Sequence, residues 1–344
     1  MAVTVVPPQP GAVPAAGPTW IRPGRTLLVA STGGHLDQLY RLRRAFDPQL
    51  EEVEWATFDT GQSQHLLTGE VVHIVPFIRP KDLAGTRAGA AAAIRLLRGQ
   101  RFARVISTGA AVAVPFITTA RSLGLAAHYI ESAARSTGPS LSGQLVSRVP
   151  GVRLYAQYAA WTAGRWQLRG AVFDAYRPGR DPVELADGLS KVVVTFGTQR
   201  GYGFRRAAER LSRVLPQVCR TDADILWQTG STDTTGLGLD SRDTVPAAEL
   251  EAAVAEADLV VSHSGIGSAL LALKHGRCPV LIPRRHAHGE HTDDHQRQIA
   301  DDLSRRSLAV AAEASEVTAE HLLTAAAMSA TAVDHPRPFI LQPD

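Results

Sequence analysis

Cysteine and long apolar runs are scarce in this 344-residue chain. Its two cysteines, Cys219 and Cys278, are too few for a disulfide framework or for a zinc site of their own, which predicts a reducing compartment, by default the cytoplasm. No stretch of about 18 apolar residues is free of charge. Even the segment Val105–Ala120 lies between Arg104 and Arg121, so we predict no membrane-spanning helix.

Lysine is also scarce, and positive charge is not concentrated anywhere. Of 36 cationic residues, three are lysines (Lys81, Lys191 and Lys274), the arginines are spread along the chain, and the net charge is only +3. Nucleic-acid-binding proteins gather their cations into one stripe, so we predict no nucleic-acid partner. The hydrophobic fraction of 44% is enough for globular cores, and the length favours two domains of roughly 150 residues each.

Short aliphatic runs alternate with helical patterns from Arg25 onward, which is typical of parallel βα units in an α/β fold. We predict a flexible tail over residues 1–24, which hold six prolines, a first Rossmann-like domain over 25–175, a linker over 176–190 and a second Rossmann-like domain over 191–335. Two doubly wound domains imply a cleft lined by the carboxyl ends of their strands. The expected strands are Thr26–Ala30, Val53–Thr57, Val71–Val75, Arg104–Ser107, Ala127–Ile130, Val152–Gln157, Val192–Phe196, Asp224–Gln228, Asp258–Ser262 and Pro279–Pro283.

The first strand runs into Gly33, Gly34 and His35 and then into a helix with the apolar positions Leu36, Leu39, Leu42 and Phe46. The two glycines permit a tight turn and a close approach of the backbone to a ligand. His35 lies off the apolar line, so we expect it to face the cleft, where a neutral imidazole can take a proton from an attacking hydroxyl. The alternative is a plain turn with a capping histidine.

The segment Asp258–Gly276 contains a strand, a polar loop and a helix whose apolar stripe is Ile266, Ala269, Leu270 and Leu273. Ser264 is the expected N-cap, and Gly276 ends the helix. Unpaired amides around Gly265, Gly267 and Ser268, with His263 beside them, predict an anion site suited to a diphosphate. A purely structural turn is the alternative, but it does not need histidine, serine and two glycines together.

The segment Ile282–Gln296 holds four of the 12 histidines. A metal site on His288, His291 and His295 is one interpretation, but the glutamate of a His-Glu-x-x-His helix is absent, and we predict no metal. His295 is in line with Ile299 and Leu303 and is expected to pack beneath the loop.

Polar side chains around that loop suit the hydroxyl groups of a sugar. Glu290, His291, Asp294 and Gln296 are the candidates, with a solvated helix start as the alternative. Gly197 and Thr198 follow the first strand of the second domain and can place amides against a phosphate. Asp222-Ala-Asp224 has the spacing of metal-holding carboxylates, but it precedes a strand, so we interpret it as a turn.

Motifs in both halves of the chain together resemble a known family. Ser31-Thr-Gly-Gly-His-Leu-Asp-Gln-Leu39 and Glu131-Ser-Ala-Ala-Arg-Ser-Thr-Gly-Pro-Ser-Leu-Ser-Gly-Gln144 are similar to the membrane-associated acceptor subunit of the two-subunit UDP-N-acetylglucosamine transferase of dolichol-linked oligosaccharide synthesis. The second half, with Phe196-Gly-Thr198, Ser262-His-Ser-Gly-Ile-Gly-Ser268 and Asp294-His-Gln296, resembles its donor-binding partner, bacterial exopolysaccharide transferase pairs and, more distantly, glycosyltransferase family 28. The chain thus looks like both subunits fused, acceptor half first.

The resemblance implies a GT-B fold, a UDP-sugar donor held by the second domain, inversion at the anomeric carbon and no metal cofactor. It places Gly34 and His35 in a loop facing the acceptor, Glu131 and Arg135 on the acceptor side, and Asp294 and Gln296 at the donor sugar. One departure is Leu271, where such transferases often have a glutamate that holds the ribose hydroxyls. The choice between uridine and thymidine nucleotides therefore stays open.

Relatives of this kind act on polyprenyl-linked acceptors, which directs attention to the segment Lys81–Arg101. It has five cations against Asp82 and an alanine-rich middle, so it is a candidate for peripheral contact with the inner face of the membrane; a helix with a basic outer face is the alternative. The predicted activity is transfer of N-acetylglucosamine to a lipid-linked saccharide. Tailoring of a soluble metabolite, epimerisation of a UDP-sugar and a non-enzymatic nucleotide-sugar-binding subunit are the competing interpretations.

Overall fold

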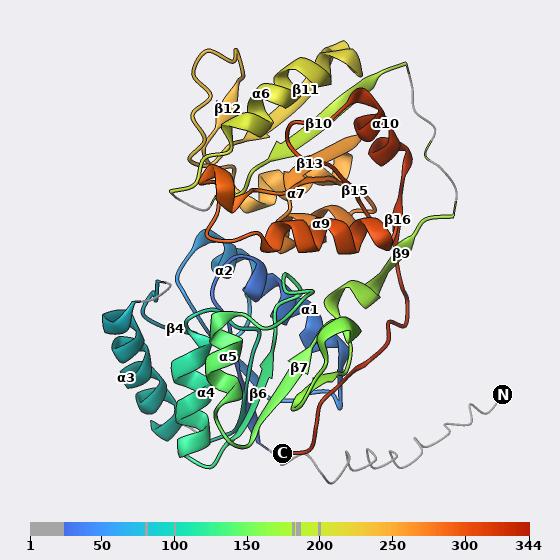
Figure 1. The fold of residues 1–344 in the computed structure, drawn as a ribbon. Helices are drawn as coiled ribbons and strands as arrows, with labels where there is room; N and C mark the ends of the chain where they lie inside the picture. The colour runs from blue at the N-terminus through green and yellow to red at the C-terminus, as the bar shows by residue number, and fades with distance from the viewer. Residues whose placement is uncertain (1–23, 80–81, 100, 181–182, 184–186, 199–200) are drawn as a thin grey trace, which may run out of the picture.

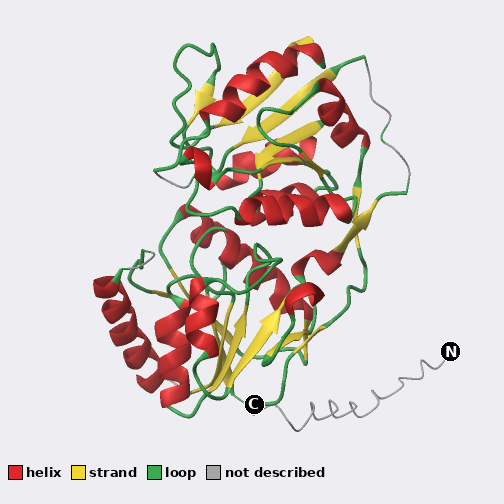
Figure 2. Ribbon diagram, in the orientation of Figure 1, coloured by secondary structure: helices red, strands yellow, loops and turns green. Residues whose placement is uncertain are grey.

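The computed structural model describes residues 24–79, 82–99, 101–180, 183, 187–198 and 201–344 (Figure 1). Nearly all of the predicted tail, residues 1–23, lies outside these ranges, as do Lys81 and part of the predicted linker. Two α/β units are stacked one above the other, and helices flank each central sheet (Figure 2). The structure confirms the predicted α/β class with two Rossmann-like units.

The first unit has a seven-stranded parallel sheet in the order β4-β3-β1-β5-β6-β7-β8. Its strands are β1 (Arg25–Val29), β3 (Val53–Thr57), β4 (Val72–Ile74), β5 (Phe102–Ser107), β6 (Ala126–Ile130), β7 (Val152–Ala156) and β8 (Trp166–Leu168). Its helices are α1 (Gly34–Ala45), α2 (Gly61–Leu66), α3 (Leu83–Gly99), α4 (Ala113–Ser122), α5 (Leu141–Ser147) and the 3-10 turns Ala159–Trp161 and Val172–Ala175.

The second unit has a six-stranded parallel sheet in the order β12-β11-β10-β13-β14-β15. Its strands are β10 (Leu189–Thr195), β11 (Cys219–Gln228), β12 (Ser241–Arg242), β13 (Leu259–His263), β14 (Val280–Ile282) and β15 (Val310–Ala311). Its helices are α6 (Arg205–Val214), α7 (Ala247–Glu256), α8 (Ile266–Lys274), α9 (His295–Arg305), α10 (Ala319–Ala327) and the 3-10 turns Leu215–Gln217 and His286–His288.

Both faces of the first sheet are covered, which explains why its strands read as unbroken apolar runs. Successive side chains of β1 point to opposite faces: Leu28 joins the apolar cluster that includes α1, whereas Leu27 and Val29 join the cluster that includes α4. The predicted apolar positions of α1 and α8 are all buried. The burial of these apolar side chains, which alternate along the strands and recur at helical spacing in α1 and α8, therefore fixes the positions of the loops that follow β1 and β13.

The interpretation of Asp222-Ala-Asp224 as a turn is wrong. These residues lie within β11, which begins at Cys219 because its first residue pairs with Leu189 at the start of β10. Both aspartates precede the carboxyl end of the strand, which is the end at which ligands bind in parallel sheets.

The chain crosses between the two units more than once. Strand β9 (Tyr176–Pro178), within the predicted linker, pairs antiparallel with β16 (Ala330–Ala332). The chain then returns to the first unit (Figure 1), where β17 (Phe339–Ile340) pairs with β2 (Phe46–Asp47). At the end, the buried carboxylate of Asp344 binds Arg104 at 2.7 Å. The last segment of the chain therefore ties the second unit to the first.

The two units also share an apolar interface. One cluster of buried residues combines α1, represented by Leu39, with Leu270 of α8 and Leu303 of α9. The acceptor-side and donor-side loops meet directly: a Cβ built on Gly34 would lie 3.2 Å from Cβ of Ile266. The expected cleft is thus closed at this point by contact between the units.

Candidate active site

His35 is the second residue of α1, and its tautomer is fixed by the neighbouring loop. Its Nδ1 lies 2.7 Å from the carbonyl oxygen of Thr108, while the Thr108 hydroxyl donates back to the carbonyl oxygen of His35 at 2.8 Å. A carbonyl only accepts hydrogen bonds, so Nδ1 carries the proton. The lone pair is therefore on Nε2, which is the arrangement that a general base needs.

The surroundings of His35 keep its imidazole neutral. Burial lowers the pKa of His35 below its ordinary value of 6.5; the Thr108 carbonyl raises it, and the positive charges of His295 and Arg135 lower it further. His35 follows Gly34, which packs on Ile266 of the second unit, so the imidazole is placed at the junction between the units. At neutral pH the imidazole is free to accept a proton.

Gly109 makes the close packing around His35 possible. Its φ is +109°, and a Cβ there would lie 3.2 Å from Cε1 of His35 and 3.0 Å from the Tyr129 hydroxyl. The loop after β5 therefore passes directly beside the imidazole. Thr108 and Gly109 are site residues that the sequence analysis missed, although Ser-Thr-Gly after a strand repeats the glycine signal of the first loop.

Glu131, predicted on the acceptor side, is buried beneath its loop. One carboxylate oxygen accepts from the amide of Ser132 at 3.1 Å, and the other accepts from the amide and hydroxyl of Ser140 at 2.9 and 3.0 Å. Burial raises the pKa of Glu131 to about 7, although these hydrogen bonds lower it. Ser140 in turn caps α5, so Glu131 supports the acceptor-side loop from within.

Arg135, the other predicted acceptor-side residue, reaches across the junction. Its guanidinium donates to Oδ2 of Asp293 at 2.7 Å. Beside it, the amide of Ser136 donates to Oε1 of Gln298 in α9 at 2.9 Å. The acceptor-side loop is thus fastened to the donor half by two polar contacts.

The predicted N-cap of α8 at Ser264 is wrong. The N-cap is Gly265, and no side chain caps the helix. The strand conformation continues through His263, which buries the Ser264 hydroxyl without a partner among the described residues. The amides of the first turn, which include Gly267 and Ser268, are therefore left without a side-chain cap at the positive end of the helix dipole.

His263 is packed between two glycines. A Cβ on Gly197, whose φ is +72°, would lie 2.7 Å from Cε1 of His263. A Cβ on Gly265 would come within 2.5 Å of Nε2. Burial lowers the pKa of His263 to about 3, helped by the charge of Arg284. His263 is therefore neutral. Gly197, in the loop after β10, packs against the turn that precedes α8, and the exposed Thr198 follows it.

Arg284 is a buried cation that the sequence analysis assigned no role. It follows β14, its Nη2 donates to the carbonyl oxygen of Phe196 at 2.8 Å, and its guanidinium lies 5.5 Å from the centre of the Phe204 ring. Its Nε and Nη1 have no partner among the described residues, and burial lowers its pKa to about 10. The cation adds positive potential behind His263.

Two of the residues predicted to contact the donor sugar already have partners within the second unit. Gln296 is buried and accepts from the Arg284 amide at 3.0 Å. Glu290 binds Arg206 through both carboxylate oxygens, at 2.8 and 3.0 Å. Both side chains therefore shape the loop. Asp294 accepts from the His286 amide at 3.1 Å but remains about half exposed, as its side-chain accessibility of 52% shows.

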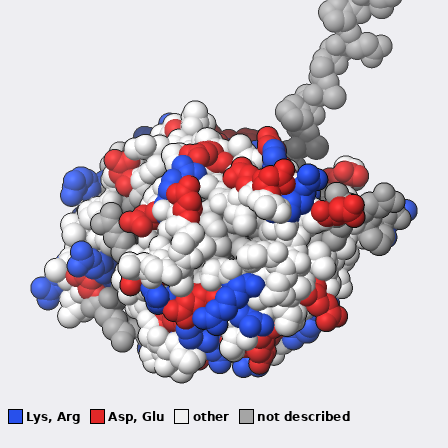
Figure 3. Space-filling model, turned by 90° about the horizontal axis from the view of Figure 1, so that it is seen from above, with Lys and Arg blue, Asp and Glu red and all other residues white. Residues whose placement is uncertain are grey.

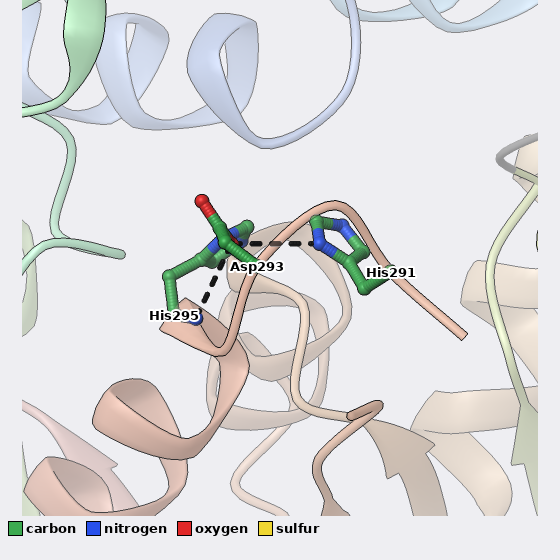
Figure 4. Close-up of side chains that lie close together, drawn as sticks. All are labelled: His291, Asp293 and His295. Atoms are coloured by element: carbon green, nitrogen blue, oxygen red, sulfur yellow. Dashed lines mark hydrogen bonds and ion pairs between the residues drawn. The ribbon is translucent and has the colours of Figure 1, made fainter. Parts of the chain in front are cut away.

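His291 and His295 converge on Asp293 (Figure 4). Nδ1 of His295 contacts Oδ1 of Asp293, and Nδ1 of His291 lies 3.6 Å from the same oxygen. His288, which the metal interpretation had included, is exposed and outside this cluster. Asp293 is the member that the sequence analysis missed, although it lies between the two histidines in the sequence.

A cavity of about 490 Å³ lies between the units. The first unit contributes residues such as Ser136 and Gln157, and α9 contributes Asp302, Arg305 and Arg306. The units are thus separated by open space toward the carboxyl end of α9.

Charge on the molecular surface follows the sequence expectation. On the face shown in Figure 3, acidic and basic side chains are intermixed, with no stripe of one sign. Within the described ranges, no helix is both long and apolar enough to cross a bilayer.

Comparison with known proteins identifies the second unit. Residues 191–334 match the glycosyltransferase family 28 C-terminal domain. No curated protein matches the chain significantly in sequence. Among solved structures, MurG of Acinetobacter baumannii has a TM-score of 0.56 at 20% identity, covering 87% of this chain and 88% of its own. The glycosyltransferase SnogD of Streptomyces nogalater has a TM-score of 0.52 at 21% identity, covering 87% and 89%.

The same arrangement of two units also occurs in another enzyme class. The UDP-GlcNAc 2-epimerase of Methanocaldococcus jannaschii, solved with UDP-GlcNAc and UDP, has a TM-score of 0.56 at 10% identity, covering 88% of this chain and 91% of its own. At such identities, the structures establish the fold alone. Together with the family 28 domain, they show a GT-B glycosyltransferase with a nucleotide-sugar-binding second unit.

Proposed function

We propose that the chain transfers N-acetylglucosamine, with inversion, from a UDP-sugar to a hydroxyl group of a polyprenyl-diphosphate-linked saccharide. The observation that carries the proposal is the meeting of the two loops: the turn that holds His35 packs, through Gly34, on the uncapped start of α8. A base from one unit and an anion site from the other are thereby brought together. The chain then performs in one polypeptide the work of an acceptor half and a donor half.

In the proposed reaction, Nε2 of His35 takes the proton of the acceptor hydroxyl as its oxygen attacks the anomeric carbon. The bond from that carbon to the UDP oxygen breaks, and the electron pair leaves with the diphosphate. Amides at the start of α8, including those of Gly267 and Ser268, stabilise the developing negative charge. This part of the reaction needs no metal, since the helix terminus supplies the positive potential, which buried Arg284 reinforces.

The choice of nucleotide depends on two comparisons and on Leu271, which replaces the glutamate that such transferases often have. The family 28 domain and the likeness to an epimerase solved with UDP-GlcNAc and UDP support a UDP-sugar. Leu271, part-buried on α8, offers the ribose no carboxylate. Uridine recognition must then come from other groups, and thymidine nucleotides are the competitor that an experiment has to include.

Calorimetric titration of UDP, dTDP and GDP into the full chain, in EDTA, tests the proposal. UDP should bind preferentially in EDTA, and His263→Ala should weaken it because the imidazole fills the space between Gly197 and Gly265. His65→Ala is the matched control, since this half-exposed histidine on α2 faces Glu251 of α7 and not the start of α8. Absence of nucleotide binding would contradict the transferase proposal.

The lipid-linked acceptor is supported by an exposed surface on the first unit. The outward side of α3 exposes Leu83, Arg87, Ile94, Arg95 and Arg98. Large apolar side chains are also exposed at the end of β4, where Ile74 is 58% exposed, and in the loop before α3, where Phe77 is 63% exposed. Cations interleaved with exposed apolar residues fit the surface of an anionic membrane.

Flotation with anionic liposomes tests this surface. The wild-type chain should float with the vesicles, and Leu83→Ser should reduce the floating fraction because Leu83 is 78% exposed. Leu323→Ser, at another exposed leucine on α10, is the matched control. A chain that stays wholly in the soluble fraction would favour a soluble acceptor, as in a metabolite-tailoring transferase.

The epimerase alternative has its own signature. The archaeal epimerase shares the arrangement of two units with this chain, and an epimerase interconverts UDP-sugars with no acceptor present. Incubation of the chain with UDP-N-acetylglucosamine alone should therefore leave the sugar unchanged. A second UDP-sugar appearing in that incubation would contradict sugar transfer.

A further inference from the structure

The loop between β14 and α9 gathers two imidazoles and a carboxylate at one point (Figure 4). One ligand atom each from His291, Asp293 and His295 lies within 4.8 Å of the others. The distance of 3.6 Å between Nδ1 of His291 and Oδ1 of Asp293 is close to the separation of two ligands around one small cation. These are the donor types that late first-row metals prefer.

We propose that His291, Asp293 and His295 form a binding site for a late first-row divalent cation, with Zn²⁺ the representative ion. Imidazole nitrogen with one carboxylate suits such ions, whereas Mg²⁺ and Ca²⁺ take oxygen ligands. Three protein ligands leave at least one coordination position for water or for a bound molecule. The proposal rests on the geometry of these three residues and not on the proposed transfer reaction.

The surroundings of the three ligands fix their positions. His291 is buried, its ring stacks on Tyr202 with centroids 5.7 Å apart, and its carbonyl oxygen lies 3.1 Å from Nδ1 of His286. His295 is held as the first residue of α9. Partners of this kind, which orient metal ligands from outside, are a regular part of metal sites in proteins.

Asp293 connects the site to the other unit. Its Oδ1 faces the two histidines, while its Oδ2 accepts from Arg135 of the first unit at 2.7 Å. The carboxylate thus joins a cation on one side to a guanidinium on the other. Metal binding would therefore fix the loop of the donor half and stabilise its contact with the acceptor half, so Zn²⁺ should raise the melting temperature.

The test uses the full chain without a histidine tag, stripped with EDTA and then freed of chelator. Titration with Co²⁺, followed by visible absorption, should show one tightly bound ion per chain that Zn²⁺ displaces. His291→Ala, His295→Ala and Asp293→Asn should each weaken binding by at least about 100-fold, more than the loss of an outer partner does. His288→Ala, an exposed histidine of the same loop, should bind as wild type.

A second variant separates coordination from the link between the units. Arg135→Gln removes the partner of Oδ2 and keeps all three ligands, so it should still bind Co²⁺ while losing part of the Zn²⁺-induced rise in melting temperature. Circular dichroism of each variant confirms that it is folded. Wild-type protein that binds no Co²⁺ at micromolar concentration, or ligand variants that bind as wild type, would overturn the proposal.

Discussion

Replacement of His35 by alanine tests the proposed division of labour between the two units. The change removes the only side chain that we assign as a base, together with the hydrogen bond from Nδ1 to the Thr108 carbonyl, which spans 2.7 Å. Losing that bond should lower the free energy of unfolding by about 0.5–1.5 kcal/mol. The variant should therefore still fold.

The effect of losing the base on the reaction rate should be far larger than its effect on stability. A positioned general base contributes roughly 10²–10⁴-fold, so kcat should fall by that factor, equivalent to about 2.7–5.5 kcal/mol in activation free energy. UDP affinity should stay within about 2-fold of wild type, because the donor is assigned to α8 and its neighbours in the other unit. His65→Ala, at a half-exposed histidine of the first unit, should leave both quantities unchanged.

The pH dependence gives an independent test of the same residue. Burial and the charges of His295 and Arg135 lower the pKa of His35 below 6.5. The imidazole is therefore uncharged at pH 7 and stays uncharged until the pH falls below 6.5. We expect kcat to decrease only when the pH drops through this lowered pKa. The acid limb should vanish in the residual activity of His35→Ala. Full activity of that variant, or an unchanged acid limb, would refute the assignment.

Two further substitutions probe the donor turn and the acceptor-side loop. Gly265→Ala brings a Cβ against Nε2 of His263, so UDP affinity in calorimetry should fall about 10-fold, ~1.4 kcal/mol; unchanged affinity would remove the donor site from this turn. The pKa of Glu131 is raised from 4.5 to about 7. Between these two pH values the folded state therefore keeps a proton that the unfolded state releases. The free energy of unfolding should therefore fall as pH rises through it, by up to ~3 kcal/mol, and urea unfolding of Glu131→Gln should lack this slope.

Features determined by local pattern were predictable from the sequence. The expected strand Val53–Thr57 agrees with β3, and the others differ from the observed strands mainly at their ends. The apolar stripes of α1 and α8 were also predicted, because the helical spacing of apolar residues can be seen within a short stretch of sequence. The loops that follow β1 and β13 could therefore be assigned to the site before any contact was known.

Features determined by distant partners were not predictable. The tautomer of His35 depends on Thr108, which is 73 residues away in the sequence. The role of Asp293 depends on Arg135, 158 residues away. Neither pairing has a periodic signal, since each is created where two separate loops meet. The partners of Glu290 and Gln296, which are Arg206 and the Arg284 amide, also cannot be found by local reasoning.

The error at Ser264 shows how a strand overrides a local preference. Serine is a favoured N-cap, but the amide of Ser264 donates to the carbonyl oxygen of Ile282 in β14, at 3.2 Å, and so continues the ladder of the sheet. The helix starts one residue later, at a glycine with no side chain to offer. Function benefits from this outcome, because a serine cap would occupy an amide that an anion can use.

The closed contact between Gly34 and α8 also constrains how the enzyme works. A diphosphate at the start of α8 and an acceptor beside His35 both need space close to Ile266, against which Gly34 is packed. The buried cluster shared by α1 and α8 resists separation of the units, whereas the polar contacts of Arg135 and Ser136 on the α9 side exchange readily with water. Substrates should therefore enter by opening that side, where the cavity between the units already lies.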